Sequence, residues 1–238
     1  MKILAIDSSG MTASAAIAEE GKLIAEYSVN NKKTHSQTLL PMVDEIVRMA
    51  QLDRGSIDAI AVAGGPGSFT GLRIGAATAK GIGLALKKPL ISVPTLEAMA
   101  YNAWGMQGLV VPMMDARREQ VYTGIYRFDG EGITAVMEQD ALSLEELMSR
   151  LNERGERAFL LGDGTTAFRD KIRDALKIPF VFAPPHMNQQ RAGAVACCAF
   201  ARAARGEFVA AADFRPDYLR LSQAERVRAE QTGEAGNA

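Results

Sequence analysis

The sequence predicts an α/β protein of two lobes, each a mixed β-sheet flanked by helices. Three observations support this fold class. The first hundred residues alternate apolar runs and amphipathic stretches in the order strand, strand, strand, helix, strand, helix, strand, helix. The second half repeats this order in a looser form. The 238 residues, 47% of them hydrophobic and 23% charged, are enough for one large domain or two small ones.

The first lobe is expected to span residues 1–106. Its strands are predicted at residues 2–9, 12–18, 22–31, 58–63 and 90–93, and its helices at residues 38–52, 70–86 and from Thr95 onward. The first helix shows apolar residues at a helical period. Pro41 lies near the start of this helix, where its missing backbone N–H is tolerated. The lobe is therefore predicted to be a three-stranded meander that is extended by helix-linked strands.

The second lobe is expected to span residues 107–227, with the boundary near residues 104–108. Its strands are predicted at residues 109–114, 120–128, 133–138, 159–161 and 180–182, and its helices at residues 143–154, 166–176 and 189–205. Ser143, with Glu146 three residues later, is a typical helix N-terminal signal. Residues 228–238 are expected to form a disordered tail. A meander extended by helix-linked strands is the unit of the actin-like, hexokinase-like and Hsp70-like ATPase fold, which is the fold that we predict.

The charge balance argues against a protein that holds nucleic acid alone. Lys and Arg total 27 and Asp and Glu total 28, which gives a formal net charge of −1. A protein that binds tRNA by itself usually has a basic excess, because phosphate neutralisation dominates nucleic-acid affinity. We therefore expect any contact with tRNA to be made only through a complex.

The cysteines and the apolar runs indicate a cytoplasmic protein. Cys197 and Cys198 are the only cysteines, and two adjacent cysteines form neither a disulfide framework nor a metal site. Too few apolar residues precede Asp7 for a signal peptide. No apolar run approaches the roughly 18 residues that cross a bilayer. No membrane association is expected.

Two loops have the composition of a nucleotide site. Asp7-Ser8-Ser9-Gly10 follows the first strand and is a candidate nucleotide loop, although Asp7 is at least as well suited to cap its own turn. The glycine-rich segment 64–71 precedes a helix whose free N–H groups can attract an anion. It lacks the Gly-Lys-Ser/Thr ending of a phosphate loop, because Leu72 and Arg73 follow Gly71. We expect weak binding of ATP with magnesium at most, and no other cofactor.

The sequence predicts no catalytic residue and no metal ligand. Its two histidines, His35 and His186, belong to no recognisable metal motif. His35 is expected to have a surface or capping role at the start of the first long helix. A Gly-x-Ser-x-Gly nucleophile elbow is also missing from the sequence.

A stripe of small residues follows one face of the predicted helix 70–86. Gly71, Gly75, Ala79 and Gly83 fall at four-residue spacing, with Ala76 beside them. Each glycine inside a helix costs roughly 1 kcal/mol relative to alanine, so a stripe of them indicates that another backbone comes close. That backbone belongs either to the chain's own sheet or to a helix of a partner, and the spacing does not decide between the two.

Several segments together resemble the TsaB family, also called YeaZ. They read ILAIDSS, HSQTLLPMV, AVAGGPGSFTGLRIG, SVPTLEAMA, DARREQVY and PDYLR, and they cover nearly the whole chain. The resemblance implies an actin-like fold and a non-catalytic helper role for the threonylcarbamoyl transferase TsaD, together with the ATPase TsaE. TsaD has a metal site in a His-Leu-Glu-Gly-His stretch. Thr95 and Met99 occupy the two histidine positions here, which places catalysis in the partner.

The resemblance also implies a pairing surface on the helices 38–52 and 70–86. The residues that we assign to this surface are Leu39, Met42, Val43, Ile46, Met49, Leu72, Gly75, Ala76, Ala79 and Gly83. On this assignment, Ala76→Arg is expected to abolish pairing with TsaD and to leave the free chain folded.

Two other classes of protein remain open. One is a stand-alone enzyme, either an ATP-using phosphotransferase of the same fold or a peptidase. The other is a homodimeric binding module that uses the same helix face, with a homodimer forming when TsaD is absent.

Overall fold

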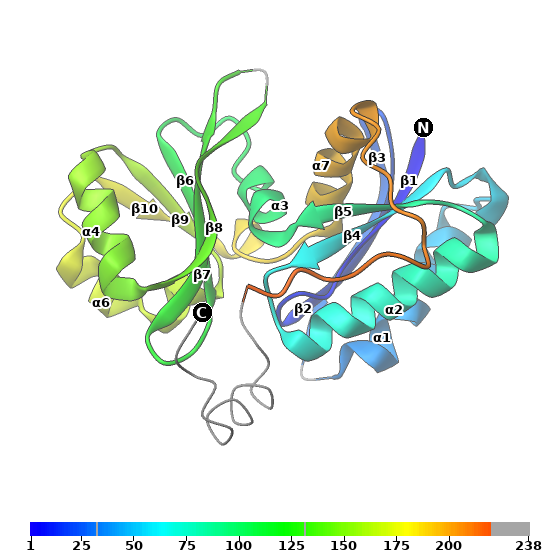
Figure 1. The fold of residues 1–238 in the computed structure, drawn as a ribbon, viewed down its shortest axis with the longest axis horizontal. Coiled ribbons are helices and arrows are strands. Elements are labelled where there is room, and N and C mark those ends of the chain that lie inside the picture. The colour runs from blue at the N-terminus through cyan, green and yellow to red at the C-terminus, as the bar shows by residue number, and fades with distance from the viewer. Residues whose placement is uncertain (32, 131, 220–238) are drawn as a thin grey trace.

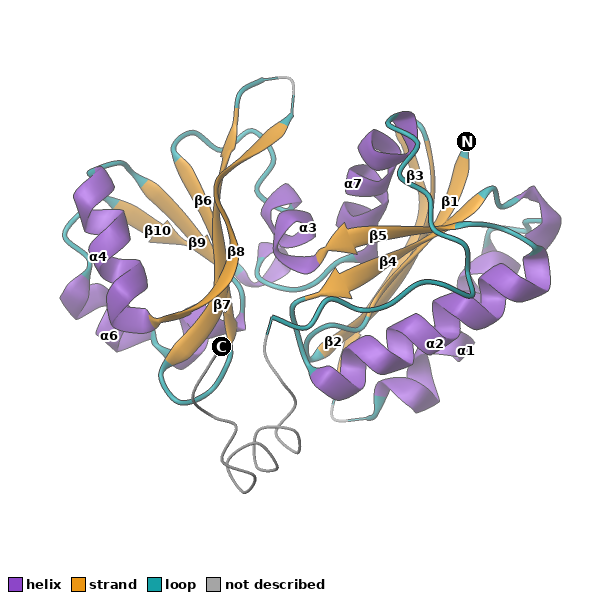
Figure 2. Ribbon diagram, in the orientation of Figure 1, coloured by secondary structure: helices purple, strands orange, loops and turns teal. Residues whose placement is uncertain are grey.

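The computed structural model describes residues 1–31, 33–130 and 132–219. Figure 1 shows two lobes side by side, each built around one sheet. The first sheet contains β1 (Lys2–Asp7), β2 (Thr12–Glu19), β3 (Lys22–Asn30), β4 (Ala59–Gly65) and β5 (Leu90–Pro94). The second contains β6 (Leu109–Asp115), β7 (Gln120–Phe128), β8 (Ile133–Ser143), β9 (Ala158–Leu161) and β10 (Phe180–Phe182). Figure 2 separates these strands from the helices by colour.

The two sheets have the same topology. The strand order is β3-β2-β1-β4-β5 in the first sheet and β10-β9-β6-β7-β8 in the second. In each sheet the three meander strands pair antiparallel, and the last two strands join in parallel. The internal duplication predicted from the element order is therefore confirmed, as is the α/β fold with two mixed sheets flanked by helices.

The helices lie close to their predicted positions. They are α1 (His35–Met49), α2 (Phe69–Leu86), α3 (Thr95–Tyr101), α4 (Leu144–Arg154), α5 (Asp163–Ala167), α6 (Arg169–Ala175) and α7 (Ala192–Ala204), with short 3-10 turns at Arg54–Ser56 and Pro185–Met187. The predicted cap is confirmed, since the Ser143 hydroxyl accepts the Glu146 N–H at 3.1 Å. The single helix predicted at residues 166–176 is two helices, because the backbone leaves the helical region at Phe168.

The division into lobes at residues 106 and 107 is wrong for the end of the chain. The strands β1, β2 and β4 are buried along nearly their whole length, so the first sheet needs helices on both faces. Helices α1 and α2 cover one face, and α7 covers the other with a small-residue surface around Val195 and Ala196. Residues 207–218 then run beside α2 and β5, with Phe214 buried in the first core. The predicted tail 228–238 lies outside the described residues.

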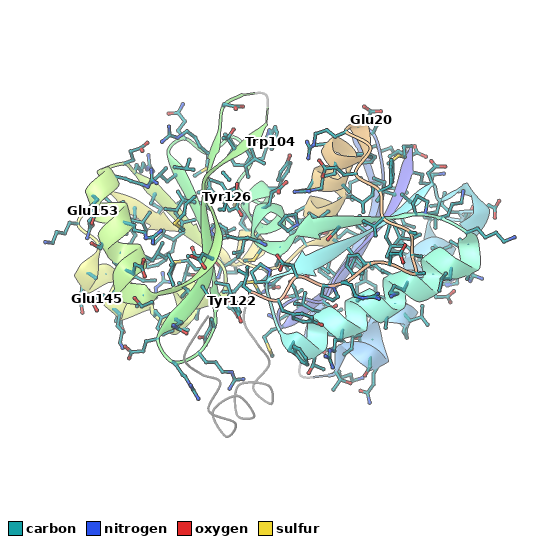
Figure 3. All side chains as sticks on the ribbon, viewed as in Figure 1. Glu20, Trp104, Tyr122, Tyr126, Glu145 and Glu153 are labelled. Carbon is teal, nitrogen blue, oxygen red and sulfur yellow. The ribbon has the colours of Figure 1, made fainter. Side chains whose placement is uncertain are left out.

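Helix α3 joins the two lobes. One side of it packs on α7, and the other side contributes Leu96 and Met99 to a core on the second sheet. Tyr122 and Tyr126 of β7 belong to this shared core, and both are labelled in Figure 3. Trp104, in the connection that follows α3, packs edge-on against Phe128 with ring centroids 4.9 Å apart. The lobe boundary predicted near residues 104–108 is therefore stabilised by aromatic packing.

Candidate functional site

The loop after β1 is a closed turn around a buried carboxylate. Asp7 is 1% exposed, and its Oδ1 accepts the Ser9 N–H at 2.8 Å and the Ser9 hydroxyl at 2.6 Å. Its Oδ2 is buried with no hydrogen-bond partner among the described residues. Burial raises the pKa of Asp7 to about 6, although the hydrogen bonds from Ser9 and the nearby His35 lower it. Asp7 caps its own turn, as one of the two interpretations of this loop predicted.

The glycine-rich segment after β4 packs directly on this loop. The Ser68 N–H donates to the Ser9 carbonyl at 2.7 Å, and the Ser8 hydroxyl donates to the Gly71 carbonyl at 2.9 Å. A methyl group at Gly67 would lie 2.4 Å from the Ser9 carbonyl oxygen, so this approach needs glycine. The two loops fill the space beside each other, and the Ser68 N–H at the start of α2 is engaged within the chain.

His35, the first residue of α1, contacts this loop. Its Nε2 lies 2.8 Å from the Gly10 carbonyl oxygen, and its Nδ1 is buried with no partner among the described residues. The amide of Gln190 packs so closely on Gly10 that a methyl group there would lie 2.4 Å from it. Gly10 therefore lies in close contact with the Gln190 side chain, and the His35 ring contacts the same loop from the start of α1.

Thr95 and Met99 lie one turn apart in α3, and both are buried. The Met99 sulfur accepts from the Gln190 amide at 3.7 Å and contributes to the shared core, while the Thr95 hydroxyl is buried with no partner in the described part of the chain. Within residues 1–31, 33–130 and 132–219, no group of three or more His, Cys, Asp or Glu side chains is placed to hold a metal ion.

Burial contradicts the assignment of the pairing surface for eight of its ten residues, while Val43 is buried but lines the groove described below. Leu39, Met42, Val43 and Ile46 of α1 and Leu72, Gly75, Ala76, Ala79 and Gly83 of α2 are all buried within the chain. Met49 alone is exposed, at 66%. The reason is the amphipathic pattern itself, because the apolar faces of both helices cover the first sheet.

The glycine stripe of α2 is an intramolecular contact. A methyl group at Gly71 would lie 2.1 Å from the Ser8 carbonyl oxygen, and one at Gly75 would lie 2.6 Å from the Ser8 hydroxyl. At the other end of the helix, a methyl group at Gly83 would lie 2.5 Å from Leu90. The stripe lets α2 approach the β1–β2 loop and β5 closely, so the interpretation of a contact with the chain's own sheet is the correct one. The expectation that Ala76→Arg leaves the chain folded assumed an exposed Ala76, but Ala76 is buried, so we expect this substitution to destabilise the chain.

A second stripe of small residues faces outward on α2. Ala77, Gly81 and Ala85 are exposed and fall at four-residue spacing. A methyl group at Gly81 would meet no atom within 4 Å, so nothing among the described residues requires glycine there. The spacing was visible in the sequence, but the inward stripe shares it. Which stripe faces the sheet becomes clear only from the packing.

A groove of about 580 Å³ opens between α1 and α2. Its walls are Leu40, Pro41, Val43, Asp44 and Val47 from α1 and Ile82, Ala85 and Leu86 from α2, above a floor of Leu4, Arg54 and Ile57. Leu40 is 56% exposed and Leu84, on the outer side of α2, is 59% exposed. Large apolar side chains gathered beside a groove are typical of a protein-binding surface. We call the groove, with Ala77, Gly81 and Leu84, the outer helix face.

No helix among the described residues is both long enough and apolar enough to cross a membrane.

Comparisons with known proteins agree with this architecture. The family model of TsaD, tRNA N6-adenosine threonylcarbamoyltransferase, matches residues 22–227. The tRNA threonylcarbamoyladenosine biosynthesis protein TsaB of Bacillus subtilis is 34% identical over 94% of this chain and 96% of its own length. The solved structure of YeaZ from Pseudomonas aeruginosa superimposes with a TM-score of 0.79 and 28% identity, over 92% of this chain and 99% of that one.

A more distant structure shows the fold alone. An activator of 2-hydroxyisocaproyl-CoA dehydratase from Clostridium difficile, solved with bound ADPNP, gives a TM-score of 0.50 at 11% identity, over 87% of this chain and 97% of that one. This likeness agrees with the predicted actin-like ATPase fold. The family model and the relative of nearly equal length decide the assignment. The chain belongs to the TsaB (YeaZ) family, within the wider family that the TsaD model describes, and has a role in tRNA threonylcarbamoyladenosine biosynthesis.

Proposed function

We propose that this chain is a non-catalytic subunit that pairs with a TsaD-family threonylcarbamoyltransferase through the outer helix face. TsaE joins this pair in our proposal, and tRNA is held mainly by the assembled complex. The proposal includes a cytoplasmic location, which agrees with the two unpaired cysteines Cys197 and Cys198.

The observation that carries the proposal is the outward stripe of α2 beside an apolar groove. Glycine in the middle of a helix is unfavourable by roughly 1 kcal/mol relative to alanine. At Gly75 and Gly83 the chain's own packing requires glycine, whereas at Gly81 it does not. The small residues on this face would let a partner helix come close to the α2 backbone, as the first sheet does on the inner face. The exposed Leu40 and Leu84 would supply apolar contacts at the edges of that helix packing.

The buried loops support a subunit without its own chemistry. Ser9 is fully buried and donates its hydroxyl to the Asp7 carboxylate. Among the described residues, neither His35 nor His186 is hydrogen-bonded to a serine, which argues against a Ser-His peptidase. The start of α2 has its Ser68 N–H bonded to Ser9, which argues against tight phosphate binding there.

An activity assay tests the catalytic part of the proposal. Unmodified tRNA and threonylcarbamoyl-adenylate are incubated with this chain alone, with its TsaD-family partner alone, and with both. We expect no modified nucleoside from this chain alone and the highest yield from the pair. Multiple turnover by the lone chain would contradict the proposal and favour the stand-alone enzyme.

A mass measurement tests the pairing itself. Light scattering after size-exclusion chromatography should give a complex of this chain with the TsaD-family partner when the two are mixed. A homodimer that persists at the same face in the presence of excess partner would instead support the homodimeric binding module.

A further inference from the structure

The connection between β6 and β7 has an unusual backbone. Arg117, Arg118 and Glu119 follow one another with φ angles of 63°, 53° and 57°, all in the left-handed region. Residues other than Gly, Asn and Asp rarely adopt this backbone conformation, because their Cβ atom then crowds the neighbouring carbonyl oxygen. Hairpin turns that need positive φ angles are usually built from Asn and Gly. Two arginines and a glutamate are therefore unusual residues for this connection.

The connection is held firmly by its surroundings. The Asp115 carboxylate accepts the Arg117 N–H at 2.7 Å, and the Gln120 N–H donates to the Arg117 carbonyl at 3.1 Å. The Glu119 carbonyl accepts the Leu144 N–H at 2.9 Å, and its carboxylate forms an ion pair with Lys171. These bonds explain how the left-handed backbone persists, and they give the Glu119 side chain a role within the fold.

The Arg117 and Arg118 side chains have no such role. Both residues are exposed, and within the described residues neither guanidinium forms an ion pair or a hydrogen bond. Eight other arginines of the described chain do form ion pairs: Arg48, Arg54, Arg127, Arg150, Arg173, Arg191, Arg202 and Arg205. Strained backbone of this kind gathers at functional sites. Two large cations on such a backbone, with no side-chain partner among the described residues, indicate a partner outside the chain.

We propose that Arg117 and Arg118 bind neighbouring phosphates of the RNA substrate when this chain is part of its complex. A guanidinium presents a planar set of donors that matches phosphate oxygens, and a rigid backbone lowers the entropic cost of binding. RNA is the polyanion that the family's role in tRNA modification supplies. Because the net charge of this chain is −1, this contact supplements RNA binding by other surfaces of the complex. It rests on the proposed function, in which tRNA is held mainly by the assembled complex, and goes beyond it by assigning residues of this chain to that contact.

The position of the connection separates this contact from the pairing surface. It belongs to the second lobe, whereas α1 and α2 cover the first lobe (Figure 1). Variants at Arg117 and Arg118 should therefore leave pairing with the TsaD-family partner unchanged.

The test compares two double variants of this chain, each assembled with the TsaD-family partner. The first is Arg117→Gln with Arg118→Gln. The control is Arg154→Gln with Arg157→Gln, which removes two exposed arginines that also have no side-chain partner among the described residues. The probe is an unmodified tRNA transcript with an adenosine beside the anticodon, and its dissociation constant is measured at several salt concentrations.

Removing one arginine that binds a phosphate should reduce the slope of log K against log salt by about 0.7–0.9. We therefore expect a slope lower by about 1.4–1.8 for the first variant, and a wild-type slope for the control. Raising the salt from about 50 to 200 mM should weaken wild-type binding roughly tenfold more than it weakens binding by the first variant. An unchanged slope would overturn the proposal, and so would an equal change in the control.

A glycine variant distinguishes function from folding. Arg117→Gly with Arg118→Gly fits the left-handed backbone, so the melting temperature should stay the same or rise while RNA binding weakens as in the glutamine variant. A melting temperature several degrees lower would show that the arginines serve the fold, and would overturn the proposal.

Pairing is measured before RNA is added, which keeps the two proposals apart. Loss of pairing in the arginine variants alone would mean an acidic protein surface in place of RNA and would overturn the inference. Failure of the wild-type chain to pair contradicts the proposed function, whereas normal pairing with an unchanged salt slope contradicts only the inference about Arg117 and Arg118.

Discussion

Two neighbouring alanines of α2 face opposite ways, and replacing each with arginine distinguishes the two faces of this helix. Ala76 is buried in the core of the first lobe, together with Val62 and Ala79. An arginine there would bring an unpaired charge into an apolar core. Overpacking alone costs about 1–3 kcal/mol, and an uncompensated buried charge raises the loss to about 3–5 kcal/mol. For a chain of this size, each kcal/mol lowers the melting temperature by about 2–4 °C, so Ala76→Arg should lower it by about 6–20 °C.

Ala77 is the matched control on the same helix. It is exposed, so its guanidinium would stay in water, and the melting temperature of Ala77→Arg should stay within about 2 °C of wild type. The same side chain projects into the outer helix face. It should weaken pairing with the TsaD-family partner by about 2 kcal/mol or more, which is roughly a thirtyfold loss of affinity.

Thermal melting by circular dichroism and a pull-down with the partner are run on the same preparations. An Ala76→Arg variant that melts like wild type, beside an Ala77→Arg variant that melts early, would refute the assignment of the two faces. An Ala77→Arg variant that is folded and pairs normally would show that the pairing surface lies elsewhere.

Three further predictions concern single sites. Gly81→Ala should stabilise the free chain by about 0.5–1 kcal/mol, because a methyl group there meets nothing, and it should weaken pairing in the pull-down. Asp7→Asn should stabilise the chain at neutral pH by about 1–3 kcal/mol. Burial raises the pKa of Asp7 to about 6 in the folded state, so the ionised carboxylate that is present at neutral pH destabilises the fold, and asparagine removes that charge. That gain should appear in urea titrations as the pH rises from about 4 to 6 and should vanish below about 4; a gain that is independent of pH would contradict the burial argument. Calorimetry of the free chain with ATP and magnesium should show no sub-micromolar binding, since the loops at Ser9 and Ser68 bond to each other.

Local patterns predicted most of the fold. The periodicity of residues 2–94 and its looser copy predicted the order of strands and helices along the chain in both lobes, and Ser143 with Glu146 marked the start of α4. The return of α7 to the first sheet was missed because it depends on contacts between residues far apart in the chain. One signal could have indicated it. The apolar runs of β1 and β4 do not alternate, which is typical of a sheet buried on both faces.

The candidate site was less accessible to sequence reasoning. Helical spacing groups Gly75, Ala79 and Gly83 on one face, but it groups Ala77, Gly81 and Ala85 equally well on another. Only the packing against Ser8 and Leu90 shows which stripe faces inward. The left-handed connection at Arg117 and Arg118 was also invisible, because its residues have none of the composition that marks such turns.

Hydrogen–deuterium exchange on the free and the paired chain measures the pairing surface most directly. We predict slower exchange on pairing in residues 36–49 and 77–86, where α1 and α2 present the outer helix face, and unchanged exchange in α7 and in the second sheet. Protection confined to α7 or to the second lobe, with α1 and α2 unchanged, would contradict the account.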